Sequence, residues 1–248
     1  MGTSMPEFCV SLISALKGTS YLAVGNIVGS NIFNTLLIVG VSALVAPMSI
    51  MKTTVRKDIP FALVASALLL IMCLDGDISR IDAAILFVMF LIFMYITLRG
   101  AKAQGTDLEE KEKKPMATWL SVVWILVGLV CLIGGSNLFV DGATAVATKL
   151  GVSEAVIGLT IVAGGTSLPE LATSVVSARK GNSGIAIGNV LGSNVFNILA
   201  ILGLTGVISP MTLKGITMTD LSMMVISIIL IWLFSFTKYK IERWEGAI

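Results

Sequence analysis

The sequence predicts an all-α polytopic membrane protein that contains an inverted-topology repeat of five helices each. Three observations predict this fold. Of the 248 residues, 56% are hydrophobic and only 13% are charged, whereas about a quarter of the residues of soluble domains are charged. Several apolar windows approach the roughly 20 residues that a helix needs to cross a bilayer. Two long motifs also occur twice with one constant spacing.

Seven apolar windows are expected to cross the membrane, in whole or nearly so. They lie at residues 21–46, 58–75, 81–98, 117–140, 152–178, 183–208 and 218–237. Two partial spans flank them, at residues 2–16 and from Trp244 to the end. The stretch from Arg99 to Pro115 is the strongly hydrophilic one, and we expect it to be a solvated loop.

The basic residues predict the orientation of these spans, because cytoplasmic loops carry an excess of lysine and arginine. Of the 17 basic residues, most fall in alternate loops near residues 47–57, 99–116, 179–182 and 238–243. The other loops contain only Lys17, Arg80, Lys149 and Lys214. We therefore expect the first set of loops to be cytoplasmic, most simply in the plasma (inner) membrane of a prokaryote.

The duplication is clear from two motifs. Gly-Thr-Ser-Met-Pro-Glu begins at Gly2 and reappears as Gly-Thr-Ser-Leu-Pro-Glu from Gly165, an offset of 163 residues (165 − 2). Gly-Asn-Ile-Val-Gly-Ser-Asn-Ile-Phe-Asn begins at Gly25 and reappears from Gly188 as Gly-Asn-Val-Leu-Gly-Ser-Asn-Val-Phe-Asn, at the same offset (188 − 25). An odd number of expected spans separates the copies, so they run in opposite directions. Inverted repeats are typical of secondary transporters, whose substrate site lies where the repeats meet.

The same offset predicts the domain organisation. Residues 1–98 form a first repeat, 99–116 a cytoplasmic polar loop, and 117–248 a second repeat. A counterpart of the helix at 117–140 would precede Met1, and the final helix would continue beyond Ile248. We therefore expect both repeats to be truncated relative to a parent of ten helices.

The residues suited to chemistry lie in the repeated motifs. Glu7 and Glu170 lie within apolar helices at equivalent positions, and a carboxylate at membrane depth is costly enough to indicate function. A glycine and a proline nearby interrupt the helix and free backbone carbonyls. Ser and Thr hydroxyls add oxygens on the same turn, and Asn34 and Asn197 lie one turn beyond Ser30 and Ser193. Oxygen ligands without sulfur or imidazole suit hard cations such as Na+, Ca2+, Mg2+ or K+.

Two structural interpretations of these motifs compete with the functional one. Ser-x-Pro-Glu resembles a capping box with proline in the first turn, which would only restart a helix after a break. The glycine-rich motif resembles small-residue helix packing. A cap explains one glutamate, but it does not explain two inverted copies of one acid and hydroxyl cluster.

Composition excludes several other functions. There is no histidine, which excludes Ser-His-Asp catalysis and histidine-ligated metals. We expect no enzyme activity and no cofactor. The net charge of +2 and the lack of a basic, aromatic-rich patch predict no nucleic-acid partner. The expected partners are cations and the lipid bilayer, and the oligomeric state stays open.

At these motifs the sequence resembles the cation/Ca2+ exchanger superfamily, specifically its Na+/Ca2+ exchanger branch in the compact prokaryotic form. The resemblance covers essentially the whole chain. It implies a ten-helix antiporter that uses inward movement of Na+ to extrude Ca2+ by alternating access, with two peripheral gating helices that slide against the core. The helix at 117–140 resembles one of that pair, and the other would precede Met1.

The resemblance also implies a set of ion ligands, residue by residue. These are Thr3, Ser4, Glu7, Ser30 and Asn34 in the first repeat, and the carbonyl of Ala163 with Thr166, Ser167, Glu170, Ser193 and Asn197 in the second. Some family members have an acid where this chain has Asn34 or Asn197. The neutral amides leave K+ co-transport and the stoichiometry open.

Two alternatives remain. The cation/H+ branch resembles this chain at Pro-Glu, but it typically carries an acid near the Gly-Asn motif, where both copies here are neutral. The other alternative is an inactive truncated transporter fragment.

Overall fold

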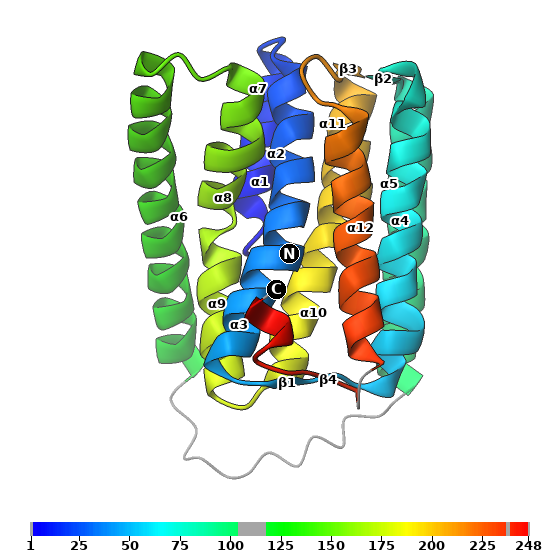
Figure 1. The fold of residues 1–248 in the computed structure, drawn as a ribbon, viewed down its shortest axis with the longest axis vertical. Helices are drawn as coiled ribbons and strands as arrows, with labels where there is room; N and C mark the ends of the chain where they lie inside the picture. The colour runs from blue at the N-terminus through cyan, green and yellow to red at the C-terminus, as the bar shows by residue number, and fades with distance from the viewer. Residues whose placement is uncertain (1, 104–117, 237–238, 248) are drawn as a thin grey trace.

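The fold of this computed structural model consists of helices that run roughly parallel to one axis (Figure 1). The structure describes residues 2–103, 118–236 and 239–247. Elements labelled η are π-helical or 3-10 turns. The first half contains α1 (Met5–Leu16), α2 (Ser20–Ile32), η1 (Phe33–Ile38), α3 (Val39–Val45), β1 (Met48–Ser49), η2 (Thr54–Asp58), α4 (Ile59–Met72), η3 (Cys73–Asp75), β2 (Asp77–Ile78) and α5 (Arg80–Ala103).

The second half begins with a long helix and ends in a short turn. Its elements are α6 (Thr118–Lys149), α7 (Glu154–Ile157), η4 (Gly158–Val162), α8 (Ala163–Thr166), α9 (Leu168–Arg179), α10 (Ser183–Val195), η5 (Phe196–Leu202), α11 (Gly203–Ile208), β3 (Met211–Thr212), α12 (Met218–Ser235), β4 (Lys240–Ile241) and η6 (Glu245–Ala247).

Six of the seven predicted spans are present as apolar helices among the described residues. Continuous helical segments long enough to cross a membrane run over Ser20–Val45, Thr54–Asp75, Arg80–Arg99, Ser183–Ile208 and Met218–Ser235. A sixth segment is broken: Gly158–Thr166 and Leu168–Arg179 meet at a bend of 52°. Pro169 stands at the start of α9 and has no N–H to continue the preceding helix, which explains the break. The protein is therefore an integral membrane protein.

The repeat governs the element boundaries. α1 and α9 begin and end at equivalent residues, as do α2 and α10, and the turns at Gly18 and Gly181 share φ +78°. That left-handed conformation suits glycine, which ends a helix there without a Cβ clash. The π-helical turns η1 and η5 also begin at equivalent residues, Phe33 and Phe196.

Two short strand pairs join the repeats at opposite ends of the bundle. β1 pairs with β4 through Met48 and Ile241, and β2 pairs with β3 through Ile78 and Met211. Because the offset relates Met48 to Met211 and Ile78 to Ile241, each pair is the image of the other. In Figure 1 one pair lies at the bottom of the bundle and the other at the top. The two repeats are therefore inverted, as predicted.

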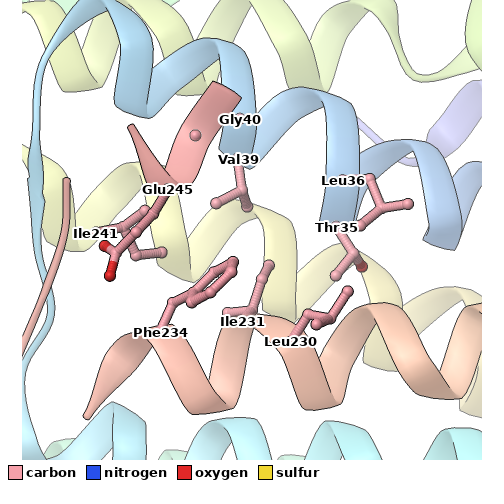
Figure 2. Close-up of a pocket in the computed structure, with 10 residues that line it drawn as sticks. Thr35, Leu36, Val39, Gly40, Leu230, Ile231, Phe234, Ile241 and Glu245 are labelled. Carbon is pink, nitrogen blue, oxygen red and sulfur yellow. The ribbon is translucent and has the colours of Figure 1, made fainter. Parts of the chain in front are cut away.

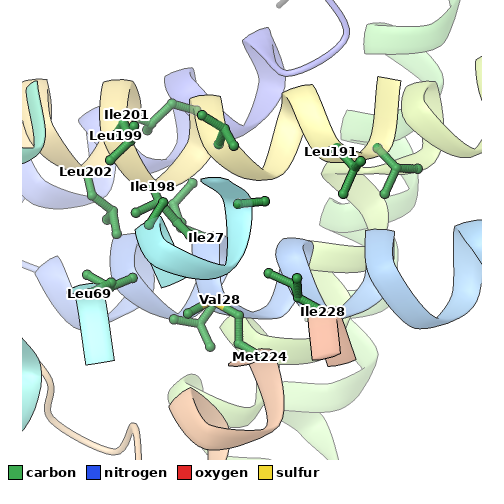
Figure 3. Close-up of a cluster of buried hydrophobic side chains, with 14 of the residues drawn as sticks. Ile27, Val28, Leu69, Leu191, Ile198, Leu199, Ile201, Leu202, Met224 and Ile228 are labelled. Carbon is green, nitrogen blue, oxygen red and sulfur yellow. The ribbon is translucent and has the colours of Figure 1, made fainter. Parts of the chain in front are cut away.

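The apolar core lies between the halves, and the outside of the bundle is also apolar. Figure 3 shows buried side chains of α2, α4, α10, η5 and α12 packed together, including Ile27, Leu69 and Ile198. On α5, by contrast, large apolar residues such as Ile81, Ile92 and Ile96 are exposed. An exposed apolar surface along a whole helix marks a face that is covered by something other than water. The bilayer is the covering that the composition predicts.

The lysine-rich and arginine-rich loops gather at one end of the bundle. β1, β4 and the turn after Arg179 lie at the bottom in Figure 1, while β2, β3 and the turn after α6 lie at the top. The alternation of loops that the sequence predicts is therefore present. Of the predicted loop at 99–116, residues 99–103 belong to α5, and residues 104–116 lie outside the described residues.

Two predicted boundaries are wrong. The helix predicted at 117–140 continues to Lys149 in α6, because Ala143, Val146 and Ala147 extend the apolar pattern beyond Asp141. The partial span predicted from Trp244 is the 3-10 turn η6, not the first turn of an α-helix. Gly246 of this turn packs against α3, where its Cβ would lie 2.7 Å from the Gly40 carbonyl oxygen.

Candidate ion-binding site

Two glutamates lie at the centre of the molecule, one from each repeat. Glu7 belongs to the first turn of α1 and Glu170 to the first turn of α9, and each is fully buried. Each follows a proline at the start of its helix, and α9 also follows the bend that separates it from α8.

Serine hydroxyls connect the two glutamates crosswise. Ser4 Oγ donates to Glu170 Oε1 at 2.8 Å and lies 3.0 Å from Ser193 Oγ. Ser167 Oγ donates to Glu7 Oε1 at 3.0 Å. Since Ser4 and Ser167 are equivalent residues, the serine that precedes each glutamate binds the glutamate of the other repeat. One polar cluster therefore contains residues from both repeats.

Further hydroxyls and carbonyls surround the second repeat's broken helix. Ser30 Oγ donates to the Ala163 carbonyl oxygen at 3.3 Å, and Thr166 Oγ1 donates to the same carbonyl at 3.1 Å. Thr166 also lies within 3.1 Å of Asn26 Oδ1, and Thr3 stands 3.4 Å from the equivalent Asn189 Oδ1. Thr3 is half-buried, whereas Ser30, Ala163 and Thr166 are buried.

Asn34 and Asn197 complete the cluster from the π-helical turns. Asn34 Nδ2 donates to Asn194 Oδ1, and Asn197 Nδ2 donates to Asn31 Oδ1, each at 3.1 Å. Both side chains are fully buried. The wider π turn, often found at functional sites, is formed at equivalent places in both repeats.

Four buried oxygens of the predicted site residues have no hydrogen-bond partner among the described residues: Glu7 Oε2, Glu170 Oε2, Asn34 Oδ1 and Asn197 Oδ1. They form two equivalent pairs, one in each repeat. A buried acceptor without a partner costs about 1–3 kcal/mol, and more when it is charged. Acceptors cannot satisfy one another, but a cation satisfies several of them at once.

The arrangement suits a hard cation. The ligands on offer are carboxylate, amide, hydroxyl and carbonyl oxygens, which Na+ and Ca2+ prefer. Within the part of the chain that the structure describes, no three acidic, cysteine or histidine side chains gather to hold a metal.

Hydrogen bonds link the predicted residues Thr3, Ser4 and Ser193 to Glu170, and Ser30, Ala163, Thr166 and Ser167 to Glu7, directly or through a neighbour, whereas Asn34 and Asn197 bond to Asn194 and Asn31. Their role as ion ligands stays a prediction. Sequence reasoning did not single out Asn26 and Asn189, or Asn31 and Asn194. Asn26 Nδ2 donates to the Glu7 carbonyl oxygen, and Asn189 Nδ2 to that of Glu170, each at 3.3 Å. All four asparagines stand in the repeated motif, so their recurrence at the offset of 163 was a signal available in the sequence.

One crevice at the surface lies away from the glutamates. Figure 2 shows it between η1, α3 and α12, lined mainly by apolar side chains such as Val39, Ile231 and Phe234, with Glu245 at its edge. None of the predicted site residues lines it. The glutamates are shut off from solvent in this conformation.

Comparisons with known proteins agree with this architecture. The sequence model of a family described as "Sodium/calcium exchanger protein" matches residues 1–99 and 120–248. "Inner membrane protein YrbG" of Escherichia coli is 38% identical over 218 residues, which cover 85% of this chain and 67% of that protein. "Sodium/calcium exchanger MaX1" of Methanosarcina acetivorans is 32% identical over 289 aligned positions, which cover 100% of this chain and 82% of that protein.

A solved structure has the same fold. It is the sodium-calcium exchanger NCX_Mj, soaked with 10 mM Na+ and 10 mM Sr2+. It superposes on this chain with a TM-score of 0.80 at 33% sequence identity, and the match covers 99% of this chain and 79% of the other.

Proposed function

We propose that this chain, which belongs to the sodium/calcium exchanger family, exchanges Na+ for Ca2+ across a membrane at the cluster of Glu7 and Glu170. Membership of the family makes it a cation/Ca2+ antiporter. The identity of the coupling ion and of the ligands is the proposal. The ligands are the residues named from the sequence: Thr3, Ser4, Glu7, Ser30, Asn34, Ala163, Thr166, Ser167, Glu170, Ser193 and Asn197.

One observation carries the proposal: the four unpartnered oxygens of Glu7, Glu170, Asn34 and Asn197. All four are acceptors, two are carboxylate oxygens, and each repeat supplies two. A helix cap with a purely structural role would not require unpartnered oxygens at equivalent positions in both repeats. A cation at the centre would be held equally by both halves of the molecule.

Charge explains why two ions would compete. Two carboxylates neutralise one Ca2+, or they divide their charge among several Na+ ions that share the same oxygens. Both ions cannot occupy the shared oxygens together, so binding of one expels the other. Exchange then follows if the loaded site can open to either side, which inverted repeats allow because each repeat presents the same surface to an opposite side.

The burial of the site fits a closed state in such a cycle. Glu7 and Glu170 have no exposed surface, so an ion held there could leave only after a helix moved. A site open to both sides at once would be a channel, and it would dissipate the gradient that drives exchange.

The test is Ca2+ uptake by the reconstituted chain in proteoliposomes loaded with Na+. We expect uptake that requires the outward Na+ gradient and that is lost in Glu170→Gln. Glu242→Gln is the matched control, because it makes the same substitution at an exposed surface residue. If Glu170→Gln took up Ca2+ as well as the wild type, the proposed ion site at Glu170 would be wrong.

A pH gradient applied to the same vesicles tests the H+-coupled alternative. The neutral residues in both Gly-Asn motifs favour Na+ coupling over H+ coupling. Uptake driven by the pH gradient alone would reverse that assignment. No flux under either gradient would favour the alternative of an inactive fragment.

We further propose that the end of the bundle with β1, β4 and the Arg179 turn faces the cytoplasm of a prokaryote. The distribution of lysine and arginine supports this orientation. Labelling of single cysteines introduced at Lys52 and Lys214 with a membrane-impermeant reagent in intact cells would test it. We expect labelling at position 214 and protection at position 52.

A further inference from the structure

Two asparagines that touch no proposed ion oxygen control how the amides of the site are turned. A carboxamide has an oxygen and an NH2 group of nearly equal size, so packing alone does not choose which one faces an ion. Hydrogen bonds must make that choice. At Asn34 and Asn197, the partners that make it are Asn194 and Asn31.

The geometry at Asn34 fixes its oxygen. Asn34 Nδ2 donates to Asn194 Oδ1 at 3.1 Å, which leaves Asn34 Oδ1 unpartnered. If the amide turned over, its oxygen would face the Asn194 oxygen and its NH2 would occupy the position of the free acceptor. A cation is attracted by the oxygen and repelled by the NH2.

Asn194 is itself held by Thr35. Asn194 Nδ2 donates to Thr35 Oγ1 at 2.7 Å, and the Thr35 hydroxyl donates its own hydrogen to the Asn31 carbonyl oxygen at 2.6 Å. Thr35 can therefore only accept from Asn194. The chain of bonds runs from a backbone carbonyl through Thr35 and Asn194 to Asn34.

The carboxamide of Asn197, in the second repeat, is oriented by Asn31. Asn31 Nδ2 donates to the Asn194 carbonyl oxygen at 3.2 Å, so Asn31 Oδ1 is the atom that accepts from Asn197. The residue equivalent to Thr35 is Ile198, which has no hydroxyl. Asn194 Nδ2 also lies 3.5 Å from the Asn31 carbonyl oxygen, but its shorter hydrogen bond, of 2.7 Å, is to the Thr35 hydroxyl.

We propose that Asn31 and Asn194 are positioning residues, which hold the carboxamides of Asn197 and Asn34 with their oxygens toward the ion, and that Thr35 fixes Asn194. This inference rests on the proposed function, because it assumes that a cation binds there. Positioning partners of metal ligands typically change affinity about 10- to 100-fold when they are removed.

The test is equilibrium binding of 45Ca2+ to the purified chain in detergent. Thr35→Val removes the accepting hydroxyl at nearly constant volume, and we expect the Kd for Ca2+ to rise about tenfold. Thr35→Ser restores the hydroxyl and should bring the Kd back toward the wild-type value. Asn194→Ala removes the partner of Asn34 itself and should raise the Kd at least as much.

Thr205→Val is the matched control. Thr205 is fully buried, and its hydroxyl has no hydrogen-bond partner among the described residues. The same substitution there should leave the Kd within about twofold. Thermal unfolding of each variant separates positioning from stability, because a structural role alone would lower the unfolding temperature without changing the Kd of the folded protein.

Equal Kd values for wild type, Thr35→Val and Asn194→Ala would overturn this inference and leave the proposed function standing. So would a rise in Kd that is the same for Thr35→Val and Thr205→Val. A wild-type chain that binds no Ca2+ would overturn the proposed function, and this inference with it.

Discussion

The two repeats place the same glycine in different surroundings. A Cβ built on Gly29 of α2 would lie 2.2 Å from the Leu159 carbonyl oxygen and 2.7 Å from the Ala163 Cβ, whereas one on the equivalent Gly192 of α10 meets no described atom within 4 Å. In the first case the broken helix of the second repeat fills the groove. The exchange of serine and glutamate between the repeats is symmetric, while the packing around it is not.

This difference separates two reasons for a repeated residue. At Glu7 and Glu170 both copies have equivalent partners, so both are expected to do the same work. At Gly29 and Gly192 the described residues show a steric need for only one copy. Substituting both members of such pairs tells one case from the other.

The largest effect is expected at the glutamates. Glu7→Gln and Glu170→Gln should each lower Na+-driven Ca2+ uptake at least about 100-fold if the proposed site is right, because each would remove one of the two charges that face the cation, and breaking such a buried pair costs about 3–5 kcal/mol. The measurement is initial uptake into proteoliposomes at equal protein content. Losses that differ greatly between the two variants would show that the repeats do not share the ion equally.

The next largest effect is a change in stability when Gly29 of α2 or the equivalent Gly192 of α10 is replaced. Gly29→Ala must displace the backbone at Leu159, and overpacking of this kind costs about 1–3 kcal/mol or more. Gly192→Ala should be tolerated, and it could even stabilise α10 because alanine has the higher helix propensity. Thermal unfolding in detergent measures both. Equal destabilisation would mean that Gly192 has a neighbour beyond the described residues.

A smaller loss of stability, which a second substitution reverses, is expected where Gly206 packs against Ala83. A Cβ on Gly206 would lie 2.6 Å from the Ala83 Cβ. The equivalent contact joins Ala43 to Gly246, at 2.8 Å, with glycine and alanine exchanged. Gly206→Ala should lower the unfolding temperature, and adding Ala83→Gly should recover most of the loss.

The equivalent exchange at the other contact should recover less. Gly246 also approaches the Gly40 carbonyl oxygen, to which its Cβ would lie 2.7 Å away. Ala43→Gly therefore relieves only part of the crowding that Gly246→Ala creates. Equal recovery in the two double variants would show that the backbone at Gly40 can yield.

The smallest effect is expected at the surface. Lys240 Nζ lies 3.3 Å from Glu242 Oε1, and both side chains are more than a third exposed. Such pairs contribute little, so Glu242→Gln should change the free energy of unfolding by less than about 0.5 kcal/mol. Uptake at the wild-type rate and an unchanged unfolding temperature are the expected readings. A large loss of either would place Glu242 in a role that the structure does not indicate.

Much of the fold could be predicted because it follows from the repeat and from hydropathy. The breaks before Glu7 and Glu170 could be predicted from glycine and proline, whose backbone effects are local. The π turns at Phe33 and Phe196 could not, since tertiary packing decides where a helix widens. The end of α6 at Lys149 was missed because Asp141 resembles a boundary while its helix simply continues.

The proposed ligands could be predicted from residue type, but their supports could not. A glutamate within an apolar segment is recognisable from the sequence alone. The sequence does not distinguish Asn31 and Asn194 from Asn34 and Asn197. Their distinct roles depend on which amide atom meets which neighbour. That assignment needs the fold, because the partners lie in opposite repeats.

The crossed strand pairs have a mechanical consequence. β1 with β4 and β2 with β3 tie the loops of one repeat to those of the other at both ends of the bundle. A rocking motion of one repeat against the other would have to rupture backbone hydrogen bonds at the end that opens. The two repeats are thus joined by backbone hydrogen bonds at both ends of the bundle, and α6 takes part in neither strand pair.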